Sequence, residues 1–462
     1  MPTLPALMPP TSSMFLVPET RDQPMHVGGL QLFEPPEGAG PDYISGLYRE
    51  AIAATEVAPL FRRRPHRGLS TLGQWAWADD GDIDLEHHIR HSALPRPGRV
   101  RELLALTSRL HGTLLDRHRP LWETHLIEGL DDGRFAVYSK THHALMDGVS
   151  ALRLLERSLS RDPAERLPLP FVSRPRAARS PRDGDGDGGE NAVLHAAHAA
   201  AEAVGDIAGL TPRLLSIAAR ALREQAVALP GQAPRSMLNV PITGSRRFAA
   251  DAWDLARIRA VGKAADATVN DVVLAMCAGA LRDYLLAQDA LPDAPLVAMT
   301  PVSLRGGDDE GEGNAVGAVL VSLGTDLADD EARLLAIRES TRQAKASLAG
   351  LSQLQVTALS AVVMTPLLLN LLGIARFVRP AFNLVISNVP GPADTLYWNG
   401  ARLDGLYPLS IPLEGQALNI TVTSYAGRMQ FGLTGCRRTL PHMQRLLHGL
   451  DESLAALEKA FA

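Results

Sequence analysis

Residues 142–148 (HHALMDG) bring together, in one short segment, the residue types that proton transfer requires. A neutral imidazole can take a proton from an alcohol near pH 7, which makes His142 and His143 candidate general bases. Adjacent residues of a strand point to opposite faces, so we expect only one of the two rings to face a substrate. Asp147 and Gly148 complete the segment as a carboxylate and a turn glycine. These ligand types would also suit a metal, but we expect no metal site here.

Two other histidine positions serve as comparisons. His87 and His88 are also adjacent, but no Asp-Gly pair follows them. We interpret them as ordinary strand or surface histidines. His26 is expected to be structural.

Two strands, a turn and a helix are predicted to position the 142–148 segment. Residues 122–128 alternate as a strand, 131–133 (DDG) predict a turn, and 134–140 predict the returning strand. The segment then leads into a helix that carries Leu152, Leu155 and Leu159 on one face. A strand end that feeds a loop can present side chains into a cleft from a rigid support.

The length of the chain predicts two domains. A chain of 462 residues exceeds what one hydrophobic core usually organises. We expect an N-terminal α/β domain over 1–160, a flexible linker with an alanine-rich helix over 161–238, and a second α/β domain over 239–462. Further strands are predicted at 25–33, 296–302, 315–325, 382–388, 417–425 and 428–434, and helices at 43–54, 101–115, 268–286 and 440–457.

The composition excludes several classes of protein. Hydrophobic residues at 46% and charged residues at 21% describe a globular chain, and the net charge of −5 gives no reason to expect nucleic acid as a partner. Cys277 and Cys436 are too few for a disulfide framework, and no secretory signal is evident, so cytoplasmic residence is expected. Residues 346–375 carry no charge, which leaves open a buried helix pair, an interfacial contact with a membrane or, least favoured, a span interrupted by Pro366.

Three further motifs allow a structural and a functional interpretation. Thr268 and Asp271 match a helix N-cap with its acidic partner, and the same position would let Asn270 meet a developing oxyanion; both readings stay open. Trp122, in 120–123 (PLWE), suits strand packing in a core or the wall of a substrate passage. Ser387 and Asn388 precede 389–392 (VPGP), a rigid loop that could position substrate. Residues 183–188 (DGDGDG) imitate a calcium loop, but Leu194 stands where its glutamate belongs, so we expect no calcium site.

Taken in order along nearly the whole chain, these motifs resemble one known family. They are 23–28 (QPMHVG), 120–123, 142–148, 270–271 (ND), 301–305 (PVSLR), 313–314 (GN) and 387–392 (SNVPGP). The set resembles the bacterial wax ester synthase/diacylglycerol acyltransferases, within the coenzyme A-dependent acyltransferases related to chloramphenicol acetyltransferase and to condensation domains.

The resemblance implies a fold and a set of roles. It implies two chloramphenicol-acetyltransferase-like domains side by side, each an α/β (α+β) unit with a mixed sheet and flanking helices, with the histidines in a tunnel between them. It implies that His143 is the base and that Asp147 is structural, for which Arg305 is our candidate partner. Pro120, Gly313 and Asn314 are expected as structural support, and His142 as a supporting residue.

The implied reaction joins an activated acid to an alcohol. Acyl-coenzyme A would be a co-substrate with no permanently bound cofactor, and the acceptor would be diacylglycerol or a long-chain alcohol. Thiolate is a good leaving group and the chain has no Gly-x-Ser-x-Gly elbow, so we expect direct transfer without an acyl-enzyme. A peripheral contact with the inner membrane or lipid droplets would suit such substrates.

Two alternatives remain open from the sequence. One is a related condensation or acyl-transfer enzyme that uses a carrier-protein thioester. The other is a non-catalytic lipid-binding protein on the same fold, which the complete 142–148 motif argues against.

Overall fold

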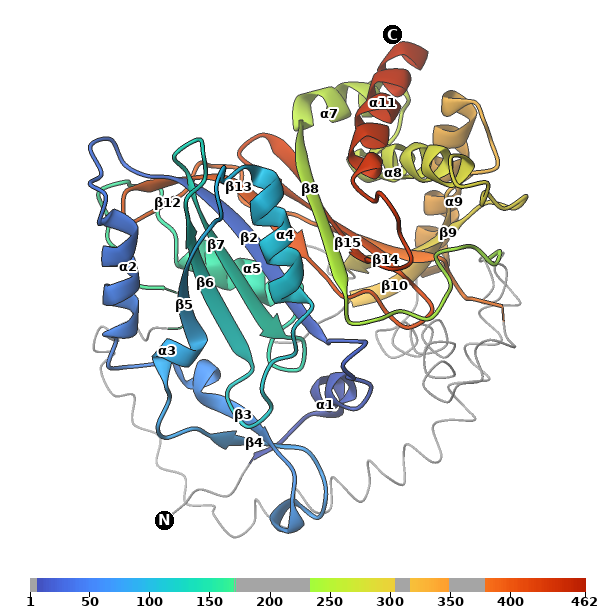
Figure 1. Cartoon of the computed structure of the whole chain (residues 1–462). Helices are drawn as coiled ribbons and strands as arrows, with labels where there is room; N and C mark the ends of the chain where they lie inside the picture. Colours follow the sequence, from blue (N-terminus) through green and yellow to red (C-terminus); the bar gives the residue numbers. More distant parts are fainter. Residues whose placement is uncertain (1–5, 170, 172–232, 304–315, 349–378) are drawn as a thin grey trace, which may run out of the picture.

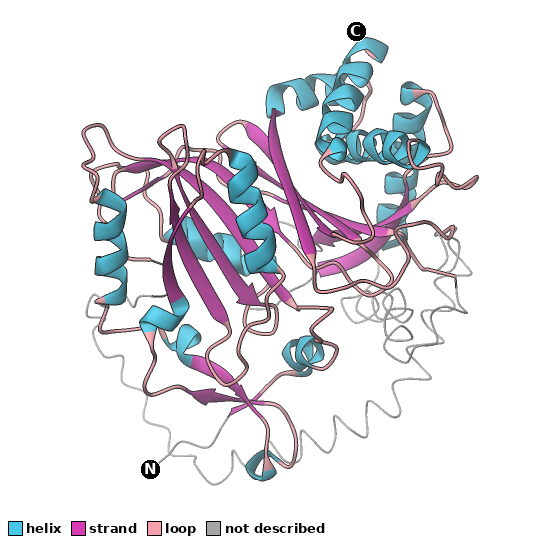
Figure 2. Cartoon of the chain, viewed as in Figure 1, coloured by secondary structure: helices cyan, strands magenta, loops and turns pink. Residues whose placement is uncertain are grey.

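The computed structural model describes residues 6–169, 171, 233–303, 316–348 and 379–462. Within these ranges the chain forms two six-stranded sheets, each with helices packed against it, and a small three-stranded sheet (Figures 1 and 2). Both large sheets mix parallel and antiparallel pairs. The expected architecture of two mixed-sheet α/β domains is confirmed.

The first large sheet has the order β12-β13-β2-β7-β6-β5. Its strands are β12 (Tyr397–Trp398), β13 (Ala401–Leu409), β2 (His26–Glu34), β7 (Phe135–His142), β6 (Trp122–Glu128) and β5 (Ile89–Ala93). Neighbours are antiparallel except β5 and β6, which are parallel.

Alternation along the strands of this sheet supplies two hydrophobic cores. One face packs Phe33, Phe135 and Val137 against helices α2 (Tyr43–Ile52) and α5 (Gly148–Arg157). The opposite face packs Leu30 and Tyr138 against helix α4 (Val100–His111). The period of two along each strand therefore fixes which residues meet which helix.

The second large sheet has the order β10-β9-β11-β14-β15-β8. Its strands are β10 (Val316–Ser322), β9 (Val297–Ser303), β11 (Leu384–Val389), β14 (Leu418–Tyr425), β15 (Arg428–Cys436) and β8 (Arg246–Asp254). One face is covered by α7 (Leu255–Ala264), α8 (Val269–Leu286), α9 (Asp330–Leu348) and α11 (Arg445–Ala460). Helix α8 is almost wholly buried there, so it forms the centre of this core.

Strands β12 and β13 join the two halves of the chain. They follow β11 in sequence but complete the first sheet, because β13 pairs with β2 over seven residue pairs from Arg402↔Glu34 to Leu409↔Gly28. The second sheet packs against the crossing strand through its face that carries no helices. There Leu406 donates its backbone N–H to Gln430 Oε1 at 2.7 Å, and a Cβ at Gly432 would lie 1.8 Å from the Pro408 carbonyl oxygen.

The small sheet lies at one end of the first domain, near the N-terminus (Figure 1). It has the order β1-β4-β3, with β1 (Ala6–Leu7), β4 (Ala76–Asp79) and β3 (Arg63–His66). The short helices η1 (Pro59–Arg62) and η2 (Leu69–Thr71) flank β3, and helix α1 (Pro10–Leu16) follows β1. The sequence patterns did not predict this unit.

Most predicted elements are confirmed, with four corrections. The helix predicted to 115 ends at His111, because Gly112 caps it, and β7 runs two residues beyond Lys140 to His142. The helix predicted from 440 begins at Arg445. His87 and His88 end a short helix, α3 (Leu85–His88), and His88 is buried against Trp122 and so is not a surface histidine.

Several predicted features fall on residues that the structure does not describe. The calcium-like loop, the alanine-rich helix and nearly all of the uncharged stretch lie outside the described residues. In the part of the chain that is described, no single helix is long and apolar enough to cross a membrane. The bent pair α7–α8, at 101°, meets the criterion by length and composition alone.

Candidate active site

Hydrogen bonds to two neighbouring segments hold the turn that carries the histidine pair. His142 ends β7 opposite His26 of β2, and its backbone N–H donates to the Leu121 carbonyl at 3.0 Å. The backbone N–H of His143 donates to the Met25 carbonyl at 2.9 Å. The motif therefore starts on a rigid strand end, as the sequence predicted.

The imidazole of His142 is fully buried, and each of its two nitrogens faces a polar group. Its Nδ1 accepts the backbone N–H of Ala144 at 3.0 Å, and its Nε2 lies 3.3 Å from Glu19 Oε1. This arrangement places the proton on Nε2 and ties the ring to the turn that follows it. The supporting role expected for His142 has this geometry behind it.

Glu19 is the centre of a buried ionic cluster that the sequence patterns did not reveal. Its side chain is 2% exposed; Oε2 accepts from Arg117 Nε at 3.0 Å and from the Arg117 terminal nitrogen at 2.9 Å, and Oε1 accepts the Met25 N–H at 3.0 Å. Burial raises the pKa of Glu19, but His142, Met25 and Arg117 together hold it below its usual value. An ionised carboxylate at this point fixes both the side chain of His142 and the strand that supports His143.

His143 is half-buried, unlike the fully buried His142, and the Nδ1 of its ring is buried. Phe15 of α1 stacks on it, with ring centroids 4.0 Å apart and planes 21° from parallel. Burial lowers the pKa of His143, while Asp147 and the ring's own backbone carbonyl raise it to a smaller extent. The net result is an imidazole that is neutral near pH 7 and so able to accept a proton.

Asp147 shapes the exit from the motif. It is the N-cap of α5, and its Oδ1 accepts the backbone N–H of Ser150 at 2.7 Å. Gly148 is the exposed first residue of that helix. The three residues expected to support the motif from elsewhere in the chain, Arg305, Gly313 and Asn314, lie outside the described residues, so the pairing of Asp147 with Arg305 stays a prediction.

The 120–123 motif is part of the support beneath the histidines. Trp122 is 2% exposed; it donates Nε1–H to the Phe61 carbonyl at 2.9 Å and stacks between His88 and Phe171. It is therefore a core residue. Pro120 immediately precedes the strand pair, where its carbonyl accepts the Trp122 N–H at 2.9 Å.

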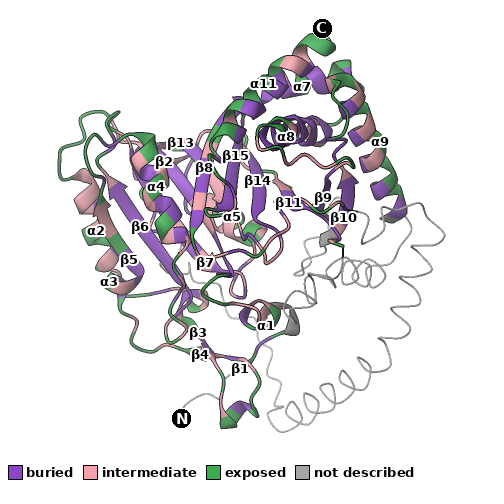
Figure 3. Cartoon of the chain, turned by 45° about the vertical axis from the view of Figure 1, so that its right-hand side comes forward, coloured by how far each residue is buried: buried purple, intermediate pink, exposed green. Residues whose placement is uncertain are grey.

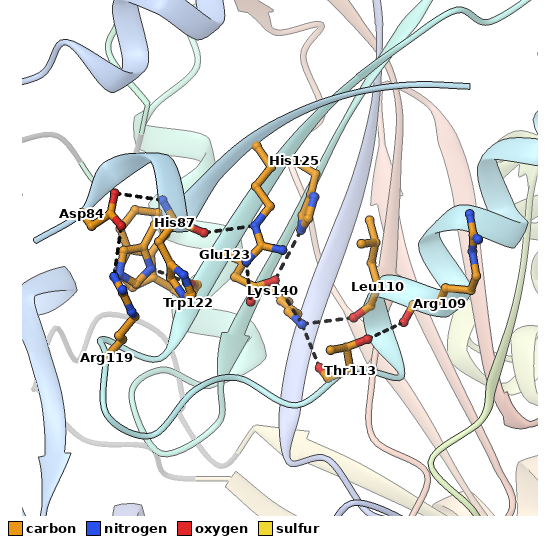
Figure 4. Close-up of polar contacts among 12 residues, drawn as sticks. Asp84, His87, Arg109, Leu110, Thr113, Arg119, Trp122, Glu123, His125 and Lys140 are labelled. Carbon is orange, nitrogen blue, oxygen red and sulfur yellow. Dashed lines mark hydrogen bonds and ion pairs between the residues drawn. The ribbon is translucent and has the colours of Figure 1, made fainter. Parts of the chain in front are cut away.

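Glu123 and Lys140 form a buried ion pair on neighbouring strands (Figure 4). Lys140 Nζ lies 3.2 Å from Glu123 Oε2 and donates to the carbonyls of Leu110 and Thr113, beside the end of α4. Burial raises the pKa of Glu123, but His125, Lys140 and Arg90 lower it to about 2. The pair joins the strand that carries the motif to the C-terminus of α4.

Two further buried histidines are structural. His26 donates Nε2–H to the His111 carbonyl at 2.7 Å, while His111 binds the Tyr138 hydroxyl and the Ser410 carbonyl at 2.9 and 3.1 Å. Burial lowers the pKa of His111 to about 3 and that of His26 well below its ordinary value. Both rings are therefore neutral, and His111 links α4 to the end of β13. The structural interpretation of His26 agrees with these contacts.

The helix-cap interpretation of Asp271 is confirmed. Thr268 is the N-cap of α8; its Oγ1 accepts the Asp271 N–H, and Asp271 Oδ2 accepts from the Thr268 N–H at 2.9 Å. Helix α8 packs on the face of the second sheet that points away from the first domain. Asp271 thus has a capping role, and an oxyanion role for half-buried Asn270 stays a prediction.

Ser387 and Asn388 lie where predicted, at the end of β11, paired with Thr421 and Val422 of β14. Ser387 shares its face of the sheet with buried polar residues of β14: Asn419, Thr421 and Thr423. Asn419 Nδ2 lies 3.4 Å from the Ile411 carbonyl, and Ile411 packs on Met25, whose own carbonyl holds His143. The sequence signal for this missed polar face was the strict polar–apolar alternation of 418–423 (LNITVT).

The described residues contain no group of three or more His, Cys, Asp or Glu side chains arranged to hold a metal ion. Three residues outside the motifs support the histidines: Phe15 stacks on His143, Glu19 lies 3.3 Å from His142 Nε2, and Arg117 pairs with Glu19. Glu19 is the first charged residue after the uncharged segment 6–18, which is the one signal that could have marked it.

Comparisons with known proteins agree with this arrangement. Residues 8–273 match the wax ester synthase/diacylglycerol acyltransferase catalytic domain, and residues 312–458 match the WS/DGAT C-terminal domain. A Mycobacterium tuberculosis protein described as a probable diacylglycerol O-acyltransferase, tgs2, is 53% identical over 98% of this chain and 99% of its own length.

Two solved structures are similar to this chain over nearly its whole length. The wax ester synthase/diacylglycerol acyltransferase from Marinobacter aquaeolei VT8 is 44% identical, with a TM-score of 0.80 over 99% of both chains. The first condensation domain of the CDA synthetase, at 16% identity and a TM-score of 0.57 over 100% of this chain and 97% of its own, shares the fold. From its family matches and its close relatives, the chain belongs to the wax ester synthase/diacylglycerol acyltransferase family.

Proposed function

We propose that this protein transfers a fatty acyl group from acyl-coenzyme A to the hydroxyl of diacylglycerol or a long-chain alcohol, with His143 as the general base. The observation that carries the proposal is the contrast between the two motif histidines. His142 is fully buried, with a hydrogen bond at Nδ1 and the Glu19 carboxylate 3.3 Å from Nε2, whereas His143 is half-buried, with a pKa below its ordinary value. The names of the relatives support the class of acceptor.

The proposed reaction needs a single proton acceptor. The acceptor hydroxyl attacks the thioester carbonyl as His143 takes its proton; collapse of the tetrahedral intermediate breaks the C–S bond, and the thiolate leaves with a proton returned from His143. The Nδ1 of His143 is buried, and we assign the resting proton to that nitrogen, which leaves the lone pair on Nε2 as the acceptor. One positioned imidazole contributes about 10²–10⁴-fold to such a step.

We infer that the reaction takes place between the two halves of the chain. His143 is held by Met25, which packs on Ile411 and, through it, approaches the polar face of β14. This seam would let acyl-coenzyme A and the acceptor approach from different sides. The division of the chain into 1–160, 161–238 and 239–462 stays part of this proposal.

The test is turnover of labelled acyl-coenzyme A by the purified full chain, with hexadecanol, monoacylglycerol and diacylglycerol as competing acceptors and no carrier protein. We expect ester to form, and His143→Ala to lower kcat by about 10²–10⁴-fold. His118→Ala is the matched control, because the His118 side chain is 94% exposed and pairs with Asp116 rather than with the motif. Undiminished turnover by His143→Ala would exclude the proposed base.

A second measurement tests direct transfer. The protein is mixed with labelled acyl-coenzyme A without an acceptor, quenched in acid and analysed for protein-bound label. We expect none in stoichiometric amount. A trapped acyl-enzyme would contradict direct transfer, and a requirement for a carrier-protein thioester would favour the condensation-enzyme alternative.

A further inference from the structure

The tip of the β3–β4 hairpin exposes two large apolar side chains to solvent. Leu69 is 98% exposed and Leu72 92%, higher values than those of the other exposed large hydrophobic residues in the described ranges. The hairpin projects from the lower end of the molecule in Figures 1 and 3, beyond the small sheet. Leucines this exposed gain almost no burial from the fold of their own chain, and two of them on one tip form an apolar surface that is open to a partner.

The exposure of the two leucines is built into the loop. Thr71, which is buried, donates Oγ1–H to the carbonyls of Gly68 and Gln74 at 3.1 and 2.7 Å and accepts the Gly68 N–H. Leu72 is held at φ +49°, a left-handed conformation that is unfavourable for leucine. The loop is thus hydrogen-bonded into a shape that points the two leucines outward, and it keeps leucine where glycine or asparagine would be less strained.

Positive charge surrounds the apolar tip. Residues 62–78 contain four arginines, at 62, 63, 64 and 67, and no acidic residue. Arg67 is fixed by its Nε–H bond to the Gly73 carbonyl at 2.6 Å and by its position 5.6 Å from the ring centroid of Trp75. Arg62 pairs with Asp79 at the base of the hairpin, Arg63 and Arg64 follow on β3, and Arg67 lies beside the tip, so the hairpin as a whole is positively charged.

Neighbouring segments extend the apolar surface and lead to the histidines. Leu7, Met14 and Val17 are 56%, 54% and 69% exposed, in an uncharged segment that includes β1 and α1. Beneath them one hydrophobic cluster contains Leu16 and Ala144, with Phe15, Trp75 and Trp77 packed against it. Ala144 belongs to the 142–148 motif and Phe15 stacks on His143, so this end of the molecule adjoins the candidate base.

We propose that the β3–β4 tip, with the exposed side chains of β1 and α1, docks the protein on an anionic phospholipid surface by inserting Leu69 and Leu72 among the lipids while the arginines contact the headgroups. Two leucines on a narrow tip are too small for a stable protein interface, which buries at least about 1,000 Å². Apolar residues bordered by arginines are the combination that interfacial membrane binding requires. Docking would also deliver a lipid-dissolved acceptor beside His143, and this part of the inference rests on the proposed function. The docking itself does not depend on the proposed function.

The test is flotation of the purified full chain with sonicated vesicles of phosphatidylcholine alone or with 30% phosphatidylglycerol, at low and high salt. We expect binding to the anionic vesicles that weakens with salt. Leu69→Ser with Leu72→Asn should lower the partition coefficient at least tenfold, since a buried leucine side chain accounts for at least about that factor. Arg63→Gln with Arg67→Gln should lower it about fivefold per arginine, and only on anionic vesicles.

Matched controls carry the same changes elsewhere on the surface. Leu286→Ser with Leu327→Ser alters leucines that are 48% and 36% exposed on the second domain, and Arg259→Gln with Arg438→Gln alters exposed arginines there. Both controls should bind like the wild type. The tip variants should keep the wild-type circular dichroism and unfolding midpoint, because their side chains bury almost no area.

Three results would overturn the proposal: wild-type protein that stays unbound on anionic vesicles, tip variants that bind as well as the controls, or a self-association that the tip variants abolish while vesicle binding persists. Vesicle binding is read without turnover. A protein that binds vesicles through the tip but forms no ester would therefore contradict the proposed function alone.

Discussion

Replacing Glu19 by glutamine tests the buried ionic cluster beneath the histidine pair. The change keeps the shape of the side chain but removes its charge and turns one acceptor oxygen into a donor facing Arg117. Each charge-assisted hydrogen bond contributes about 1.5–3 kcal/mol, and Glu19 accepts two from Arg117 and one from a neutral backbone N–H. Arg117 is 33% exposed and is partly rehydrated, so we expect a loss of about 2–4 kcal/mol from the free energy of unfolding.

The assay is denaturant unfolding of Glu19→Gln, Arg117→Met and the double variant. A coupling of about 1.5–3 kcal/mol is expected, because the second change removes a partner that the first has already stranded. The pKa of Glu19 lies below its ordinary 4.5, so its contribution is full above pH 4.5 and is lost as the pH falls through the lower, folded-state pKa. The gap between wild type and Glu19→Gln should therefore narrow below pH 4.5.

The Glu19→Gln variant also tests whether the ionic cluster affects turnover. If the cluster fixes His142 and thereby the turn that carries His143, kcat should fall about tenfold while both KM values change little. The control pair is Asp84→Asn with Arg119→Met, an exposed ion pair for which we expect less than about 1 kcal/mol. Additive effects of Glu19→Gln and Arg117→Met, with kcat unchanged, would refute the reasoning.

Three other predictions follow from the buried charges. Asp147 raises the pKa of His143, so Asp147→Asn should lower that pKa. The acid limb of the kcat/KM profile, which we expect below pH 6.5, should therefore move to still lower pH. An unmoved limb would show that the limb belongs to another group. Lys140→Met removes the buried cation beside Glu123 and the donor to two carbonyls, and leaves Glu123 with His125 and Arg90. Denaturant unfolding should therefore show a loss of about 3–5 kcal/mol in the free energy of unfolding, partly recovered by adding Glu123→Gln. His111 is neutral when folded and protonated when unfolded below pH 6.5; His111→Gln should therefore flatten the loss of stability between pH 6.5 and about 3, and an equally steep loss would contradict this.

Local signals predicted the elements that are regular over their whole length. The strand at 122–128 has the bounds of β6, and the helix at 268–286 begins at its cap Thr268 and ends at Leu286, because alternation and capping are readable within a few residues. Within the two large sheets, the patterns missed β5, β8, β12 and β13. Strand β13 runs between two sheets with a bulge near Asp404, and its side chains contact both, so its alternation is irregular.

Local patterns also predicted only part of the candidate site. The 142–148 motif marked the histidines and the cap Asp147, but their supporting contacts come from distant positions. Glu19 precedes His142 by more than a hundred residues and meets it only when α1 and β2 are packed beside β7. His88, at the end of α3, looked like a surface residue because its stacking partner, Trp122, lies on β6, more than thirty residues away in the sequence. Spacing along the chain carries no information about such pairs.

The crossing of β13 also constrains how the chain can be made and divided. Until residue 409 has been synthesised, β2 is an edge strand whose backbone N–H and C=O groups face water over most of its length. A fragment that stops before β12 would expose that edge and the side chains that β13 covers, and it should aggregate or recruit a partner strand. If the chain is produced as two separate fragments, the first fragment should therefore fold stably only when the second is present during folding, so that β13 can pair with β2.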